Sequence, residues 1–154
     1  MSKVYLFPGQ GAQFIGMGKD LYESFPETRK YFDLASTHLG FDIKEKMFSG
    51  TEADLKETRL TQPAIFIHSL AKLQTLKDFS PDAVAGHSLG EFSALVAAKA
   101  MDFETGLRLV SIRAKGMQEA CQAFPSTMAA VLGIEDQVVE KICQEVSEQD
   151  EEIV

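Results

Sequence analysis

The stretch Gly86-His87-Ser88-Leu89-Gly90-Glu91 decides the fold. It follows the short run 82–85, which is apolar after Asp82 and typical of a buried strand, and precedes the alanine-rich run 92–100, which indicates a helix. A G-x-S-x-G sequence between strand and helix predicts a nucleophile elbow, a sharp turn that exposes a serine hydroxyl. Gly86 and Gly90 fit this turn, because a Cβ there would crowd the strand–helix crossing. The alternative is a chance G-x-S-x-G in an ordinary glycine-rich turn.

The start of the predicted helix gives a second reason to expect chemistry at Ser88. Backbone N–H groups at a helix start are unpaired, and the positive end of the helix dipole lies there, so both stabilise a negatively charged oxygen. We therefore interpret Ser88 as a nucleophile that forms a covalent acyl intermediate.

Composition sets wide limits on the function. With 154 residues, of which 45% are hydrophobic and 25% charged, the chain is long enough for one ordinary domain with a sizeable core. A net charge of −8 argues against a nucleic-acid or anionic-membrane partner. Cys121 and Cys143 lack metal-ligand spacing, which predicts reduced, packed thiols and no metal site. Neither a signal peptide nor a membrane span is expected, so we predict a cytoplasmic protein.

The rest of the pattern predicts alternating strands and helices. A strand is expected over 4–7, and a helix over 26–39 that Gly40 ends. A second helix is expected from Thr61, as its cap, to about 77, with the turn-forming stretch 49–54 before it as a loop. Another helix is expected over roughly 104–121.

The pattern changes at Met128. Residues 128–132 predict a strand, 135–146 a helix, and 153–154 the first residues of another strand. This order is the opening of a split βαβ unit. A chain that ends within an apolar strand is uncommon, because its edge would stay unpaired, so we expect a truncated chain or a proteolytic piece.

Four motifs occur in order along the chain: Gly9-Gln10-Gly11-Ala12-Gln13, Thr61-Gln62-Pro63-Ala64, the stretch at 86–91, and Arg113. Together they closely resemble the malonyl-CoA:acyl carrier protein transacylase family and the related acyltransferase domains of polyketide and large fatty-acid synthases. The resemblance covers the whole chain, and the pairing of GQGAQ with GHSLGE is highly specific. Members of this family are considerably longer than this chain.

The resemblance implies an α/β fold: a hydrolase-like parallel-sheet core with a nucleophile elbow and an inserted ferredoxin-like α+β subdomain. Residues 1–125 would form the N-terminal part of the core, and 126–154 the truncated beginning of the subdomain. The implied reaction is ping-pong transfer of malonyl from coenzyme A to the phosphopantetheine thiol of acyl carrier protein, through a malonyl-serine intermediate. No cofactor or metal is implied beyond these substrates.

The resemblance also assigns roles to residues of this chain. Ser88 would be the nucleophile, and the backbone N–H groups of Gln10 and Leu89 would form the oxyanion hole. His87 would line the site, and Gln62 would hold it by hydrogen bonds. The alternatives are a plain tight turn at 9–13 and a helix-start residue at Gln62.

Arg113 stands out on periodicity as well. At about 100° per residue, it falls on the flank of the apolar side of its helix, away from Arg108 and Lys115. A guanidinium there must either extend to water or meet a buried anion. The resemblance favours the anion, since family members that select malonyl use this arginine to bind its free carboxylate, in a planar pairing that lysine does not reproduce.

No histidine of this chain is a clear general base for Ser88. His87 adjoins the serine and should leave the turn in another direction, His68 lies within an apolar helix, and His38 lies near a helix end. In the family the catalytic histidine follows the small subdomain, so we expect it outside these 154 residues and the chain by itself to be inactive.

Two other functions remain open from the sequence. One is a serine esterase with the same elbow, although such enzymes commonly use an HGG-type loop that GQGAQ does not match. The other is a non-catalytic module that binds coenzyme A or carrier protein. Carrier proteins are acidic, so docking needs a basic patch, for which the candidates are Lys44, Lys46, Lys72, Lys77 and Lys99. We expect the full-length protein to be a monomer, and this piece to pair with its C-terminal counterpart.

Overall fold

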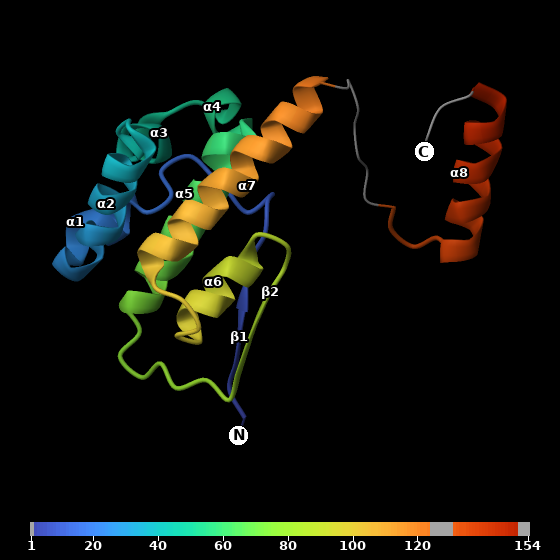
Figure 1. Ribbon diagram of the computed structural model, residues 1–154. Coiled ribbons are helices and arrows are strands. Elements are labelled where there is room, and N and C mark those ends of the chain that lie inside the picture. The colour runs from blue at the N-terminus through green and yellow to red at the C-terminus, as the bar shows by residue number, and fades with distance from the viewer. Residues whose placement is uncertain (1, 124–130, 151–154) are drawn as a thin grey trace. The chain divides into compact units, whose positions relative to one another are not determined.

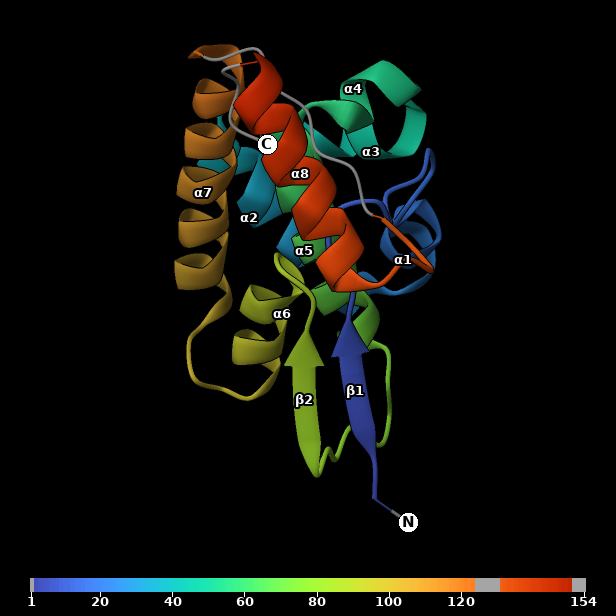
Figure 2. The ribbon, with the colours of Figure 1, turned by 90° about the vertical axis from the view of Figure 1, so that its right-hand side faces the viewer.

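Two short parallel strands, β1 (Val4–Phe7) and β2 (Ala83–Gly86), form the sheet. Val4 pairs with Ala83 and Phe7 with Gly86, so both strands end at the same edge (Figure 2). The structure is a computed structural model that describes residues 2–123 and 131–150. It divides into two units, Met1–Phe124 and Pro125–Val154.

The first unit is an α/β arrangement in which helices outnumber strands (Figure 1). Its helical elements are α1 (Lys19–Ser24), the 3-10 turn η1 (Pro26–Thr28), α2 (Arg29–Leu39), α3 (Ile43–Ser49), α4 (Glu52–Lys56), α5 (Thr58–Gln74), α6 (Gly90–Ala97) and α7 (Phe103–Ala123). The two strands expected in this unit are confirmed, and so are the helix after Ser88 and the long helix that carries Arg113. The helix that Gly40 ends is also present, but it begins at Arg29, after the 3-10 turn, rather than at Pro26.

The sheet has one covered face and one open face. Tyr5, Phe7 and Val84 point toward the helices, where Phe7 packs with residues of α6. The alternate residues Val4 and Leu6 are 58% and 76% exposed. The strand alternation therefore divides β1 into an inner apolar side and an outer apolar side that water reaches.

Helix α5 is the centre of the first unit, with α2, α6 and α7 packed around it (Figure 1). Buried residues occur all round it from Leu60 to Ala71, as expected of a helix enclosed on every side. Gly106 of α7 lies so close that a Cβ would come within 2.7 Å of the Phe66 ring. The absence of a side chain at Gly106 lets the two helices approach.

The start of α5 differs from the expectation. The helix begins at Thr58 rather than at Thr61, and Pro63 lies inside it. The Thr61 hydroxyl does not cap the helix; it donates to the carbonyls of Leu55 and Glu57, the latter at 2.9 Å. Pro63 lies beyond the first four N–H groups, which lack intrahelical partners, so its missing N–H removes one hydrogen bond from the second turn of α5.

The stretch 49–54 is not wholly a loop, which corrects a second expectation. Thr51 caps α4 by accepting from the Asp54 N–H at 3.1 Å, and the Asp54 carboxylate accepts from the Thr51 N–H at 2.9 Å. This reciprocal capping box supports a short helix in a stretch that composition alone favours as a loop. The short helices α1 and α3 also have no counterpart in the sequence-based expectation.

Helix α6 ends in a left-handed residue that is not glycine. Lys99 has φ +61°, its N–H donates to the Val96 carbonyl at 2.9 Å, and the Ala100 N–H donates to Leu95 at 2.9 Å. These paired bonds are the Schellman ending of a helix, which usually uses glycine.

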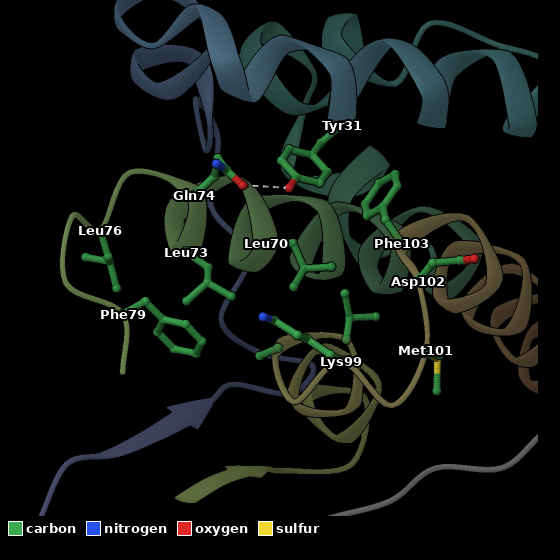
Figure 3. A pocket seen from close by; sticks show the side chains of 12 residues that line it. Tyr31, Leu70, Leu73, Gln74, Leu76, Phe79, Lys99, Met101, Asp102 and Phe103 are labelled. Carbon is green, nitrogen blue, oxygen red and sulfur yellow. Dashed lines mark hydrogen bonds between the residues drawn. The ribbon is translucent and has the colours of Figure 1, made fainter. Parts of the chain in front are cut away.

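Lys99 also lines a cavity of about 600 Å³ among α2, α5, α6 and α7 (Figure 3). At its rim the Tyr31 hydroxyl donates to Gln74 Oε1 at 3.0 Å. None of the predicted site residues lines this cavity.

The second unit contains the helix α8 (Asp136–Asp150), close to the helix expected at 135–146. Residues 128–130 and 153–154 lie outside the described residues, and Val131 and Leu132, expected in a strand, are not in one. The ferredoxin-like character of this unit stays a prediction. No helix among the described residues is both long and apolar enough to cross a membrane.

Candidate active site

Ser88 occupies the turn between β2 and α6 in a left-handed conformation, with φ +54°. The turn is fixed on both sides: the His87 N–H donates to the Phe7 carbonyl at 3.0 Å, and the Gly90 N–H donates to the His87 carbonyl at 2.9 Å. A serine held at positive φ carries strain that its surroundings must impose, and such residues cluster at functional sites. The local geometry is thus the strand–turn–helix context that the G-x-S-x-G sequence requires.

The two glycines that flank Ser88 meet backbone atoms only. A Cβ on Gly86 would lie 2.0 Å from the Gly90 carbonyl carbon, and one on Gly90 would lie 2.2 Å from the Phe7 carbonyl oxygen. Backbone cannot rotate away as a flexible side chain can. The turn therefore requires glycine at both positions.

Leu89 joins the turn to α6. Its side chain is fully buried, which anchors the residue in the core. In the described part of the chain its N–H donates to no backbone carbonyl, whereas the N–H groups of Gly90, Glu91 and Phe92 all do. An unpaired N–H directly after the serine can bind an oxyanion.

The glycine-rich loop lies against this turn. A Cβ on Gly9 would come within 2.7 Å of His87 Nδ1 and 2.6 Å of its carbonyl oxygen, so glycine is needed for the close approach. Gln10 follows directly and is exposed, as is His87. Within the loop the Gly11 N–H donates to Gln13 Oε1 at 2.8 Å. Two motifs that are distant in sequence thus meet beside Ser88.

Arg113 turns inward to polar partners rather than extending to water. Its Nη2 donates to Ser88 Oγ at 2.8 Å, and its Nη1 donates to Gln62 Oε1 at 2.7 Å. Helices α5 and α7 and the β2–α6 turn each contribute one of these three residues. The structure thus brings together three residues that the sequence analysis singled out separately.

Gln62 is fully buried, and its remaining polar group also has a partner. Its Nε2 donates to the Met117 sulfur at 3.2 Å. Met117 thus joins the candidate site, although the sequence analysis did not single it out. Its spacing of four residues from Arg113 was the available signal, since such residues are neighbours on a helix surface.

No histidine in the described part of the chain is hydrogen-bonded to Ser88. His38 lies in the last turn of α2, and His68 of α5 packs edge-on against Phe14 at 5.9 Å. Burial lowers the pKa of His68. Within the same residues, no cluster of His, Cys, Asp or Glu has the arrangement to hold a metal ion.

The basic residues considered for docking divide into two groups. Lys44 pairs with Asp33 and Lys46 with Asp54, each at 2.7 Å. Lys72, Lys77 and Lys99 form no ion pair with any residue in the described ranges. These three remain available to an acidic partner.

Comparison with known proteins agrees with these motifs. A malonyl CoA-acyl carrier protein transacylase of Staphylococcus aureus (strain MRSA252) is 46% identical over 154 residues, covering 97% of this chain and 49% of that protein. Its counterpart from Bacillus subtilis (strain 168) is 43% identical over 152 residues, covering 97% and 48%.

Solved structures agree as well. MCAT from Streptococcus pneumoniae superposes with a TM-score of 0.82 at 45% identity, covering 96% of this chain and 48% of that chain. The malonyl-transacylase PlMCAT, in complex with the type II polyketide acyl-carrier protein AntF, superposes with a TM-score of 0.81 at 37% identity, covering 96% and 48%.

The chain therefore spans about half the length of the curated relatives it matches. The acyl transferase domain matches residues 4–149, nearly the whole chain. On this match, the chain belongs to the acyl transferase domain family.

Proposed function

We propose that this chain supplies the nucleophile and the carboxylate-binding arginine of an acyl-carrier-protein S-malonyltransferase. The observation that carries this proposal is the Arg113 guanidinium 2.8 Å from Ser88 Oγ. In a malonyl thioester a single methylene separates the free carboxylate from the reacting carbonyl. A cation that selects this group must therefore lie beside the nucleophile, and an arginine offers the paired donors that a carboxylate accepts.

The proposed reaction has two half-reactions. Ser88 Oγ gives up its proton and attacks the carbonyl of malonyl-CoA, the carbon–sulfur bond breaks, and coenzyme A takes up a proton and leaves as the free thiol, so that a malonyl ester remains on the serine. The phosphopantetheine thiol of acyl carrier protein then attacks this ester, the ester carbon–oxygen bond breaks, and Ser88 regains its proton. No cofactor takes part in this scheme.

Each tetrahedral intermediate carries an oxyanion, which we assign to the backbone N–H groups of Leu89 and Gln10. The unpaired Leu89 N–H at the start of α6 supports the first assignment. The contact of Gly9 with His87, which brings the glycine-rich loop to the turn, supports the second. His87 lines the site in this proposal and is not the base.

We assign the general base to a histidine outside these 154 residues, so the chain alone does not complete a turnover. We also propose residues 1–125 as part of the α/β core and 126–154 as the beginning of a ferredoxin-like subdomain; the division between Phe124 and Pro125 supports this boundary. An acyl carrier protein is the proposed partner, supported by the relative that was solved with one.

The test is covalent labelling of the complete natural protein with radioactive malonyl-CoA, followed by digestion. We expect the label on the peptide that contains Ser88, and no label in Ser88→Ala. Ser93→Ala is the matched control, since Ser93 lies buried in α6, one turn from the site, without a hydrogen-bond partner in the described structure. Steady hydrolysis without an acceptor thiol would indicate an esterase, and binding without label a non-catalytic module.

A further inference from the structure

We propose that Arg113 selects substrates by capping the nucleophile: its guanidinium stays hydrogen-bonded to Ser88 Oγ until a substrate carboxylate displaces it. This inference rests on the proposed function and extends it from binding of the carboxylate to control of the serine. The evidence is the hydrogen bond from Nη2 to Ser88 Oγ at 2.8 Å, made by the group that would also bind malonyl.

The direction of this bond fixes its chemical effect. A guanidinium has only donors, so Ser88 Oγ must accept with one of its lone pairs. Oxygen attacks a carbonyl through a lone pair, and donation from a cation draws electron density away from that oxygen. A capped serine is therefore a weaker nucleophile toward a carbonyl that approaches from outside.

Gln62 and Met117 hold the guanidinium in place for this role. Because Arg113 only donates, Gln62 must present Oε1 to it, and the two atoms are 2.7 Å apart. The Gln62 amide nitrogen then faces the other way, where it donates to the Met117 sulfur at 3.2 Å. Gln62 is fully buried, so its amide has no water to exchange with. Nη1 is thus anchored, while Nη2 remains the end that can exchange partners.

A carboxylate competes for Nη2 better than a hydroxyl does. Hydrogen bonds between an arginine and a carboxylate are charge-assisted and often paired, whereas the serine offers one neutral oxygen. Arrival of a malonyl group therefore moves Nη2 onto the substrate and frees Ser88 in the same event. An acetyl group carries no such acceptor and meets a serine that is still capped.

An opposite effect of Arg113 is chemically possible and must be distinguished. A cation beside Ser88 also stabilises the alkoxide, and this effect alone would make the serine more reactive toward every reagent. The two effects predict opposite changes when the cation is removed, provided that the reagent has no carboxylate.

The test uses phenylmethanesulfonyl fluoride, a neutral reagent whose sulfur forms a bond to Ser88 Oγ as the sulfur–fluorine bond breaks and fluoride leaves. In the complete natural protein, we expect Arg113→Ala to react about tenfold faster than the wild type, which is the scale of one lost hydrogen bond from a charged donor. Malonyl transfer by the same variant should fall by about a hundredfold or more. Arg108→Ala, on the exposed side of the same helix, should change neither rate.

A second pair of variants keeps the cation and removes its support. Gln62→Met keeps the side-chain length but offers no oxygen to Nη1, so we expect faster sulfonylation than wild type and a higher KM for malonyl-CoA, with a smaller change in kcat. Met117→Leu removes only the acceptor for the Gln62 amide. It should therefore raise the sulfonylation rate and the KM for malonyl-CoA as well, but by less than Gln62→Met does. These variants also decide the question if Arg113→Ala does not fold, as judged by circular dichroism.

The proposal is overturned if Arg113→Ala, or a folded Gln62→Met in its place, is sulfonylated at the wild-type rate or more slowly. Failure of the proposed function has a different signature. In that case the wild-type protein takes no malonyl label at Ser88, whatever the sulfonylation rates are.

Discussion

At the scale of single residues, Ser88 keeps a backbone conformation that costs a side chain about 1 kcal/mol or more, because its φ of +54° brings Cβ close to the backbone. We predict that Ser88→Gly is more stable than Ser88→Ala by about 1 kcal/mol, since both lack the hydroxyl and only alanine retains the strained Cβ. Urea unfolding of the two variants measures the difference. Equal stabilities would mean that the turn relaxes when the hydroxyl is lost.

His68 makes the stability of the folded chain depend on pH. Burial lowers its pKa from the usual 6.5, with Lys72 acting in the same direction and Asp20 against it. Below about pH 6.5 the unfolded chain therefore takes up a proton more readily than the folded chain, so stability is greatest above this pH and declines as pH falls.

Replacing His68 with phenylalanine removes this titration. The free energy of unfolding of the wild type, minus that of His68→Phe, should decrease between pH 7.5 and 5.5. Chemical unfolding at a series of pH values gives this difference directly. A difference that stays constant across the range would contradict the lowered pKa.

At the scale of elements, the end of α6 contains a residue with backbone strain that a substitution can test. Lys99 occupies the left-handed position of a Schellman ending, at φ +61°. Glycine adopts this conformation without a Cβ penalty, so Lys99→Gly should stabilise the protein by about 0.5–1 kcal/mol. Lys99→Ala removes the same charge but keeps the Cβ and should bring no gain. Thermal unfolding of both variants separates the backbone effect from the loss of charge.

The elements also show how far sequence reasoning reaches. The longer helices and both strands of the first unit followed from apolar spacing, whereas the short helices α1 and α3 did not. Gly40 was correctly placed after α2, because the left-handed residue that ends a helix is usually glycine. The start of α5 was wrong because two competing signals, Thr61 and Pro63, lie within the helix rather than at its start. The capping box of Thr51 and Asp54 supports α4, where a loop was expected because turn-forming residues outweighed it.

The site was accessible from the sequence only in part. Ser88 could be predicted from its two flanking glycines, because they lie within two residues of it in the chain. The contacts among Ser88, Gln62 and Arg113 join positions 25 and 51 residues apart, and no local pattern contains such a separation. Met117 was missed for a similar reason, since a methionine on an apolar side is ordinary until its sulfur is seen to accept from Gln62.

At the scale of the whole molecule, the sheet has an open apolar side. Val4 and Leu6 are 58% and 76% exposed on β1, beside the exposed Ala83 and Ala85 of β2. Such a face favours association, because apolar surface and strand edges both seek partners. We predict that these 154 residues, expressed by themselves, associate as concentration rises, and that Leu6→Lys reduces this association.

Sedimentation velocity at a series of concentrations measures the effect. Leu34→Lys is the matched control, because Leu34 is 42% exposed but lies on α2, away from the strands (Figure 1). A Leu6→Lys chain that associates as strongly as the wild type would exclude the open face of the sheet as the cause.

The backbone contacts around the serine turn have a practical consequence for protein engineering. A Cβ on Gly86 or Gly90 would lie only 2.0 or 2.2 Å from main-chain atoms. Randomising either codon would therefore fill a library with chains that cannot form the turn. Gln62 and Met117 meet side chains instead, and side chains can repack. Directed evolution toward new acyl groups should therefore diversify these two positions and leave both glycine codons unaltered.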